Sequence, residues 1–218
     1  MLEKLWSFLF PPKCVICKTI LQPEQTDLCH RCRQDLSGPN SEKIKLSFLA
    51  GWTAVWYYED DVRKSILRFK FYNRRSYATS YGRLLAMQLQ QKYPEGFDIL
   101  TWVPVSRLRR WKRGYDQCKL LADSVGAELK MQPVKALKKL RNNPPQSGIV
   151  GVSARKANVL GVYTCPCPEQ VAGKRILLLD DIITTGATAS ECARILLTAG
   201  AKEVYCGAVA AAPHNQKK

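Results

Sequence analysis

The sequence predicts an α/β protein in which a mostly parallel sheet is flanked by helices and follows a small cysteine-rich domain. Beyond about residue 45, β-branched and aromatic segments alternate with segments whose apolar residues recur at helical spacing. Before that point no such period is present, and Cys, Pro and Gln are frequent. We therefore expect two domains, residues 1–45 and 46–218, joined by a turn-forming stretch at 37–41.

The N-terminal domain carries two Cys-x2-Cys pairs separated by eleven residues. Each pair lets a tight turn aim two thiolates at one point, and two such turns complete a tetrahedral shell around Zn²⁺. Such a shell has no open position, so the zinc is expected to be structural. Two alternatives stay open: His30 could replace a neighbouring cysteine, or the cysteines could be unrelated core residues. The expected ligands are Cys14, Cys17, Cys29 and Cys32.

The second domain alternates strands with helices. The expected strands are rich in β-branched, aromatic or aliphatic residues and cover residues 48–58, 97–105, 176–179 and 204–211. The expected helices carry apolar residues at helical spacing and cover residues 62–69, 77–89, 115–129 and 187–199. Residues 176–179 are all apolar, which suits a strand buried on both faces of a parallel sheet.

The charge of the chain is strongly positive. Its 218 residues contain 34 Lys and Arg against 18 Asp and Glu, a formal net charge of +16. The expected partner is therefore an anion, which can be nucleic acid, a phosphate-rich ligand or an anionic membrane. No apolar run approaches the ~20 residues that cross a bilayer. We expect a cytoplasmic protein, and in that compartment nine cysteines are poor evidence for disulfides.

The most informative segment is 176–188, in which two adjacent carboxylates, Asp180 and Asp181, follow the apolar run. A turn rich in threonine and glycine then leads into a helix. Such a turn can aim backbone N–H groups, hydroxyls and the positive end of the helix at a phosphate. The carboxylates would accept hydrogen bonds from sugar hydroxyls. The segment therefore predicts a site for a 5-phosphorylated ribose.

This segment resembles the 13-residue ribose-phosphate signature of the type I phosphoribosyltransferases. The resemblance implies that the fold of residues 46–218 is that of these enzymes. It also implies that Asp180 and Asp181 hold the ribose hydroxyls of phosphoribosyl pyrophosphate, with Mg²⁺ held largely by the ligand's own oxygens. The 5-phosphate would lie on Thr184, Thr185, Gly186, Ala187 and Thr188.

A second segment, 102–117, leaves a strand through Val-Pro and becomes basic. Five of the seven residues from 107 to 113 are cationic, and aromatic residues lie among and beside them. A solvated run of charge is one interpretation. A nucleic-acid surface is the other, because cations bind phosphates and rings stack on bases. The residues concerned are Arg109, Arg110, Trp111, Lys112, Arg113 and Tyr115, and residues 69–75 form a second such group.

The Val-Pro start, the basic turn and Arg-Gly-Tyr-Asp-Gln at 113–117 are similar to the ComF family, in which Asn stands in the place of Asp116. The resemblance extends over almost the whole chain, because three features of the family follow one another in the same order. They are the cysteine domain, Leu-Arg-Phe-Lys at 67–70 and the ribose-phosphate motif. It implies a role in natural competence, with single-stranded DNA and a competence helicase as partners. Within the ligand site it adds Val105, Ser106 and Arg107.

Two other functions stay open at this point. One is an active phosphoribosyltransferase on a small nitrogenous base, with Arg107 and Arg109 neutralising the leaving pyrophosphate. The other is a scaffold that binds the sugar phosphate without turnover. Residues 141–157 are predicted to form a long loop, either a lid that brings Gln146, Arg155 and Lys156 to the ligand or a mobile segment without a role.

Overall fold

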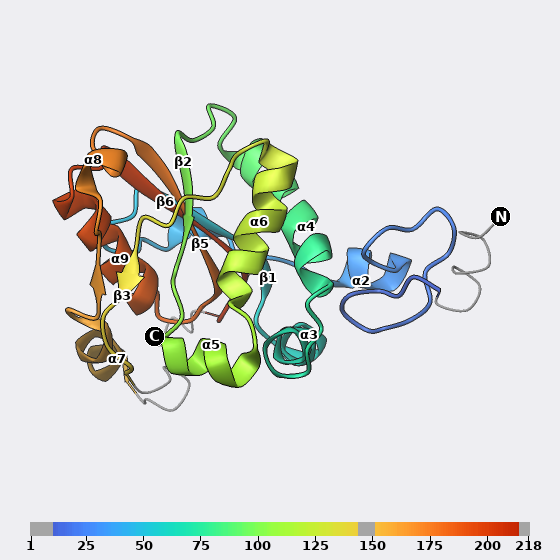
Figure 1. Ribbon diagram of the computed structural model, residues 1–218. Coiled ribbons are helices and arrows are strands. Elements are labelled where there is room, and N and C mark those ends of the chain that lie inside the picture. The colour runs from blue at the N-terminus through green and yellow to red at the C-terminus, as the bar shows by residue number, and fades with distance from the viewer. Residues whose placement is uncertain (1–10, 144–150, 214–218) are drawn as a thin grey trace.

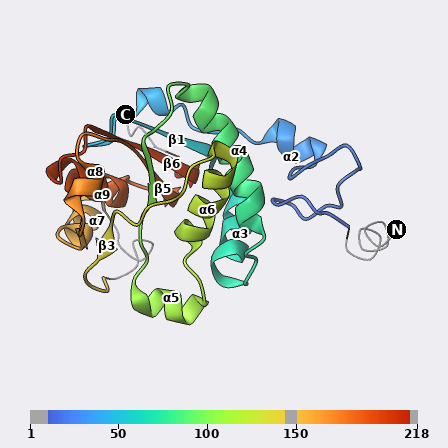
Figure 2. The same ribbon diagram turned by 45° about the horizontal axis from the view of Figure 1, so that its top comes forward.

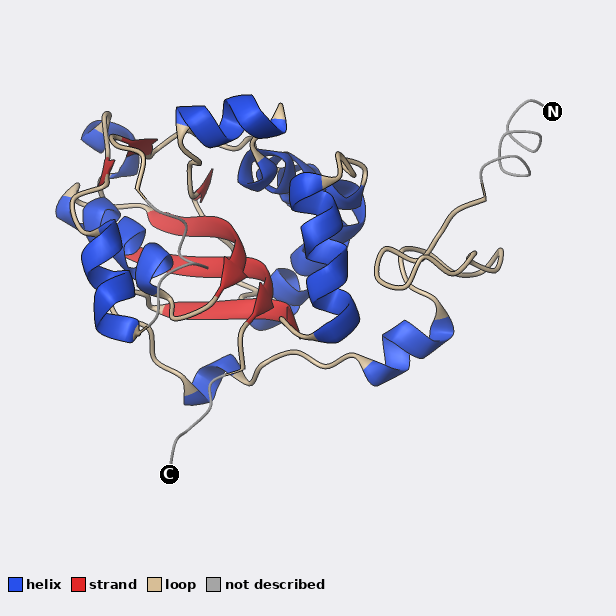
Figure 3. Cartoon of the chain, turned by 90° about the horizontal axis from the view of Figure 1, so that it is seen from below, coloured by secondary structure: helices blue, strands red, loops and turns tan. Residues whose placement is uncertain are grey.

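The computed structural model describes residues 11–143 and 151–213. Its centre is a four-stranded parallel sheet with the order β1-β6-β5-β2 (Figure 1). The strands are β1 (Gly51–Tyr57), β2 (Ile99–Trp102), β5 (Arg175–Ile183) and β6 (Glu203–Ala211). Helices lie on both faces of this sheet, as the view in Figure 3 shows. The predicted α/β class is therefore confirmed.

The alternation of side chains along β5 explains the two layers of helices. Leu177 and Leu179 are buried against the face covered by α3 (Asp60–Phe71), α4 (Tyr77–Lys92) and α6 (Gln117–Leu129). Ile176 and Leu178 are buried on the other face, together with residues of α9 (Ala187–Thr198). Successive strand residues point to opposite faces, so an unbroken apolar run is what a doubly covered strand requires.

Shorter elements surround this core. A two-stranded antiparallel sheet joins β3 and β4 beside the main sheet. In Figure 2 the α5 helix lies at the opposite end of the molecule from the zone where α4 meets β1. The shorter elements are α2 (His30–Asp35), η1 (Ser41–Lys43), α5 (Arg107–Arg113), β3 (Lys138–Lys139), α7 (Val152–Val159), β4 (Tyr163–Thr164) and α8 (Pro168–Val171).

The strand that carries the acid pair is longer than predicted. β5 does not end at residue 179 but continues to Ile183, paired with β6 throughout. Its other neighbour, β2, ends at Trp102, which pairs with Leu179. The acid pair is therefore still in a strand. At this point β5 is paired with a neighbouring strand along one edge only. The sequence could not show this, because the end of β2 lies far away along the chain.

The cysteine-rich segment packs on α3 and α4. Val15 and Ile16 are buried in the same cluster as Phe69 of α3. The Ser65 hydroxyl donates a hydrogen bond to the Val15 carbonyl, and the Arg68 guanidinium donates one to the Ile16 carbonyl. The stretch predicted as a linker also lies against the sheet, since the Tyr57 N–H donates to the Ser37 carbonyl at 3.0 Å. The boundary at residue 45 stays a prediction.

Part of the predicted loop at 141–157 is helical, because α7 begins at Val152. Gln146, which the resemblance placed on the ligand, lies outside the described residues. Across residues 11–143 and 151–213, we find no helix with the length and apolar character needed to span a membrane.

Candidate functional site

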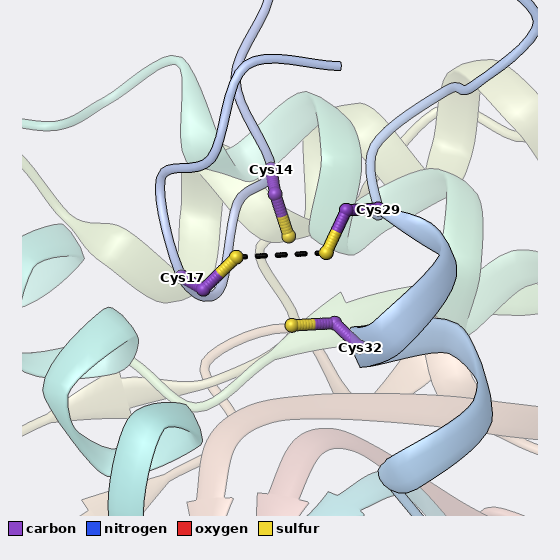
Figure 4. Close-up of side chains that lie close together, drawn as sticks. All are labelled: Cys14, Cys17, Cys29 and Cys32. Carbon is purple, nitrogen blue, oxygen red and sulfur yellow. Dashed lines mark hydrogen bonds between the residues drawn. The ribbon is translucent and has the colours of Figure 1, made fainter. Parts of the chain in front are cut away.

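The four cysteines converge on one point (Figure 4). Their sulfur atoms all lie within 4.8 Å of one another, and Cys17 Sγ is 3.6 Å from Cys29 Sγ. Four thiolates at ~2.3 Å from a central Zn²⁺ would be about 3.8 Å apart along each tetrahedral edge. The residues present therefore fit a structural zinc ion. His30 is exposed to solvent, which leaves the interpretation with four cysteine ligands.

Local structure explains how each cysteine pair is aimed. The first pair lies on a turn closed by the Cys14 N–H donating to the Thr19 carbonyl at 2.8 Å, with Lys18 in the left-handed region at φ 69°. The second pair begins α2, where Cys29 is the N-cap and Cys32 lies one turn further. A turn and a helix start each direct two side chains to the same side, as the Cys-x2-Cys spacing predicts.

The threonine and glycine turn forms a pocket at the end of β5. Gly186 adopts a left-handed conformation, φ 72°, and is the N-cap of α9. The turn therefore brings backbone and hydroxyl groups to the start of a twelve-residue helix, where backbone N–H groups favour an anion. The lining contains the whole predicted phosphate turn, Thr184, Thr185, Gly186, Ala187 and Thr188. It also contains Asp180, Ile182, Ile183 and Ala189.

The two acids of the motif have different surroundings. Asp180 lines the pocket, and its Oδ1 accepts a hydrogen bond from the Asp181 N–H at 2.8 Å. Asp181 is not in the lining. Its Oδ1 lies 2.8 Å from Lys70 Nζ, and its Oδ2 accepts a hydrogen bond from Gln117 Nε2 at 2.8 Å. Burial and the neighbouring Asp181 raise the pKa of Asp180 to about 7, while Lys70 acts in the opposite direction.

Lys70 and Gln117 are the residues that sequence reasoning missed at this site. Both lie in segments that carry the family resemblance, but neither was expected to contact the acid pair. Burial alone would lower the pKa of Lys70, yet the attraction of Asp181 keeps it above its usual value. Only the packing of α3 and α6 against β5 brings these side chains to the carboxylate, so no local spacing could have shown the contact.

Arg109 and Lys139 form a second group of cations. Arg109 is half-buried and donates to the Asn143 carbonyl at 2.6 Å. Lys139 Nζ lies 3.4 Å from the Tyr163 hydroxyl. Burial, reinforced by Arg109, lowers the pKa of Lys139 to about 8. Arg109 therefore reaches the segment that follows β3, and its predicted contact with nucleic acid stays a prediction.

The start of α5 has a structural role that the sequence did not reveal. The Ser106 hydroxyl caps the helix by accepting a hydrogen bond from the Arg109 N–H at 3.3 Å. Val105 is half-buried and Arg107 is exposed. None of residues 105–107 is in the lining of the pocket at the end of β5. Their expected contact with the ligand stays a prediction.

The basic and aromatic segments predicted separately form one surface. Trp111 of α5 is 81% exposed, and Phe71 and Tyr72 at the end of α3 are 58% and 70% exposed. Arg113 joins the two segments, because its guanidinium carbon lies 4.8 Å from the centre of the Phe71 ring. We call this set the aromatic-basic surface. It also includes the exposed residues Arg110 and Lys112 of α5.

Tyr115 does not belong to the aromatic-basic surface, contrary to the prediction. Its side chain is 7% exposed, and its hydroxyl donates a hydrogen bond to the Phe69 carbonyl. The guanidinium carbon of Arg75 lies 4.9 Å from the centre of the Tyr115 ring. Phe69 is itself fully buried. The alternation of aromatic and basic residues along the chain could not distinguish rings that pack inward from rings that face solvent.

The fold, the pocket and the cysteine cluster define a phosphoribosyltransferase-domain protein with an N-terminal double zinc ribbon domain. Residues 117–218 match the phosphoribosyl transferase domain model, and residues 5–43 match the double zinc ribbon domain model. Over 156 residues, 68% of this chain and 67% of the relative, the chain is 30% identical to the DNA utilization protein YhgH of Escherichia coli. The chain belongs to the ComF family.

Two further similarities accompany this assignment. Competence protein F of Haemophilus influenzae is 24% identical over 226 residues, which cover 92% of this chain and 97% of that protein. Among solved structures, an allosteric regulatory enzyme of purine biosynthesis is similar at 20% identity and a TM-score of 0.45. That match covers 66% of this chain and 30% of the enzyme, and it is too distant to carry a functional argument.

Proposed function

We propose that the protein binds a 5-phosphorylated ribose, with phosphoribosyl pyrophosphate as the expected ligand, in the pocket at the end of β5. One observation carries this proposal. The left-handed Gly186 at the start of α9 and the residue Asp180 line the same pocket. A phosphate and a sugar hydroxyl need these two kinds of group at neighbouring places.

Each end of such a ligand would meet suitable chemistry. The turn at 184–188 supplies hydroxyls and a helix start for the 5-phosphate. Asp180 supplies an acceptor for a ribose hydroxyl. Arg109 and Lys139 form no ion pair with a carboxylate among the described residues, so we expect these cations to be available for the diphosphate. When Mg²⁺ is present, we expect the oxygens of the ligand to hold most of it.

Calorimetric titration of the protein with phosphoribosyl pyrophosphate and Mg²⁺ tests this proposal. Thr188→Val keeps the shape of the side chain and removes its hydroxyl, so we expect affinity to fall about tenfold. Thr198→Val is the matched control, because Thr198 is exposed at the far end of the same helix. Wild-type protein that gives no binding heat would sink the proposal, as would equal affinity in both variants.

We further infer that the aromatic-basic surface binds single-stranded DNA in the cytoplasm, in the setting of DNA uptake or use. Three exposed rings and the cations of α5 support this inference, because phosphate contacts supply affinity and a ring accepts any base. The names of the relatives from H. influenzae and E. coli agree with such a setting. The resemblance also implies a competence helicase that delivers the strand.

Binding of a short oligonucleotide at several salt concentrations tests the DNA proposal. Arg110→Ala should weaken binding and reduce the slope of log K against log salt by about 0.7, the value for one phosphate contact to a single strand. Met87→Ala is the control, because Met87 is also exposed but lies on α4. Binding that does not respond to salt would contradict the proposal.

Two candidate roles remain for the sugar-phosphate pocket. In the first, the protein transfers phosphoribose to a nitrogenous base with loss of pyrophosphate. In the second, the ligand binds without turnover and only changes the protein. The cations Arg109 and Lys139 suit the first role, since they would stabilise a leaving pyrophosphate. Release of pyrophosphate with a panel of bases distinguishes the two roles.

A further inference from the structure

The α5 helix carries Trp111 and most cations of the aromatic-basic surface, yet it has no apolar face against the core. None of its residues is buried. A helix of seven residues is not stable by itself, and most helices in proteins are held by the packing of an apolar face. The position of α5 must therefore depend on contacts at its two ends.

Two contacts connect the end of α5 with α3, beside which it lies in Figure 1. The guanidinium carbon of Arg113 lies 4.8 Å from the centre of the Phe71 ring. Tyr115, which follows the helix, is buried, and its ring centre lies 6.3 Å from that of Phe69. The chain is thus anchored in the core just after α5, while the helix itself stays outside.

Arg75, in the segment between α3 and α4, makes a third connection. Its Nε donates a hydrogen bond to Asn73 Oδ1 at 2.9 Å, and its Nη2 donates one to the Gly114 carbonyl at 3.4 Å. Its guanidinium carbon also lies 4.9 Å from the centre of the Tyr115 ring. A planar guanidinium can lie over a ring while its N–H groups reach acceptors on two sides, and an ammonium group cannot do this.

Gly114 allows this contact. It ends α5 in the left-handed region, at φ 76°, and its N–H donates to the Arg110 carbonyl at 2.8 Å. A Cβ atom at this position would lie 3.2 Å from Arg75 Nη2. Glycine therefore suits both the left-handed end of the helix and the close approach of the guanidinium.

We propose that Arg75 is a positioning residue of the aromatic-basic surface, which fixes α5 against α3 and so holds Trp111 in a set place relative to Phe71 and Tyr72. This inference rests on the proposed binding of single-stranded DNA, because it assigns a role within the same surface. Rings that are held in place before the strand arrives lose less conformational entropy on binding. Arg75 acts through the position of α5 and not by binding a phosphate, although it belongs to the basic group predicted at 69–75.

The first test needs no DNA. Amide hydrogen exchange, followed by NMR, reports on the Gly114 N–H, which bonds to the last turn of α5. Arg75→Lys keeps the charge and loses the planar group, so exchange should become about fivefold faster. Arg63→Lys is the matched control, because Arg63 is exposed near the start of α3 and its side chain has no hydrogen bond, ion pair or ring contact among the described residues. Equal exchange in the two variants would overturn the role of Arg75 in holding α5.

The second test measures the binding of a short single-stranded oligonucleotide by fluorescence anisotropy at several salt concentrations. Arg75→Lys and Arg75→Gln should both weaken binding about fivefold, and neither should change the slope of log K against log salt. Arg63→Gln should bind as wild type does. A phosphate contact would give a different result: Arg75→Lys would keep its affinity, and Arg75→Gln would reduce the slope by about 0.7. That result would overturn the proposal.

A double-mutant cycle separates positioning from a general loss of stability. Trp111→Ala should weaken DNA binding about tenfold in wild-type protein. In Arg75→Lys the same change should cost only about twofold, because a ring that is no longer held in place contributes less. A variant that merely lowered the folded fraction would leave the tenfold effect of Trp111→Ala intact. An unchanged effect would therefore overturn the proposal.

These tests also separate the inference from the proposed function. Wild-type protein that does not bind the oligonucleotide would overturn the DNA proposal, and the role of Arg75 in DNA binding with it. Wild-type protein that binds, together with Arg75 variants that bind equally well, would overturn the role of Arg75 alone. Hydrogen exchange is measured without DNA, so it decides independently whether Arg75 holds α5.

Discussion

Leu46 packs directly behind Gly186, at a distance that leaves no room for a side chain. A Cβ atom on Gly186 would lie 2.5 Å from Leu46 Cδ2. Leu46 follows η1 and is buried together with Ile183 and Ala189. The pocket turn is therefore supported from behind by a segment that adjoins the cysteine-rich domain. Glycine is required at 186 both for this contact and for its left-handed φ of 72°.

Gly186→Ala is expected to lower the free energy of unfolding by about 2 kcal/mol and to weaken sugar-phosphate binding, because strain and overlap act together. Urea unfolding measures the first effect. Gly173→Ala is the control, since φ is 69° there but no atom lies within 4 Å of the new Cβ. The double variant with Leu46→Ala should recover part of the loss. Equal destabilisation at 173 and 186 would contradict the packing argument.

The pH dependence of binding should follow Asp180. Its folded-state pKa of about 7 lies above the ordinary value of 3.8, so its ionisation in the folded protein costs stability. The folded state binds the proton more tightly, and the stability from this group is lost as pH rises from about 4 through 7. Sugar binding needs the ionised acceptor and should strengthen over the upper part of that range. In Asp180→Asn this dependence should disappear, and an unchanged calorimetric pH profile would contradict the assignment.

Removal of one cysteine ligand should release the metal and loosen the N-terminal domain. Elemental analysis of freshly purified protein should find about one zinc ion per chain, and less in Cys29→Ser. Thermal unfolding should occur at lower temperature, because the cluster packs in the same core as Phe69. Cys165→Ser is the control, since this half-buried cysteine lies outside the cluster. Equal zinc contents in the two variants would remove the assignment.

Trp111 and Tyr115 should respond to mutation in opposite ways. Trp111→Ala removes an exposed ring and should weaken binding of single-stranded DNA by about 1–3 kcal/mol with little change in stability. Tyr115→Phe leaves the Phe69 carbonyl without its donor and should cost about 1–2 kcal/mol of stability while DNA affinity stays the same. Fluorescence anisotropy and urea unfolding measure the two quantities. A loss of DNA affinity in Tyr115→Phe would contradict the inward placement of its ring.

Docking of the cysteine-rich segment should depend on Ser65. Its hydroxyl donates to the Val15 carbonyl and lies 2.6 Å from the Tyr81 hydroxyl, with all three groups buried. Ser65→Ala leaves these partners unsatisfied and should lower the free energy of unfolding by about 1–3 kcal/mol. Ser153→Ala, at an exposed position of α7, should have little effect. Similar unfolding curves for the two variants would show that this contact is not needed.

The sequence by itself determined the features that depend on local pattern. The cysteine spacing set the cluster, the alternation of periods set the α/β class, and the segment at 176–188 placed a pocket turn at a helix start. These predictions succeeded because a turn, a strand or a helix start brings near neighbours in the chain to one place. The net charge likewise predicted an anionic partner without a structure, although it did not indicate which class of anion binds.

Only the tertiary structure decided which distant side chains meet. It paired Lys70 with Asp181, joined Phe71 to Arg113, brought Arg109 to the Asn143 carbonyl, and buried Tyr115. Each of these outcomes depends on how a helix is rotated and where a neighbouring strand ends. Packing of the whole core fixes these quantities, so the order of residues in one segment does not contain them.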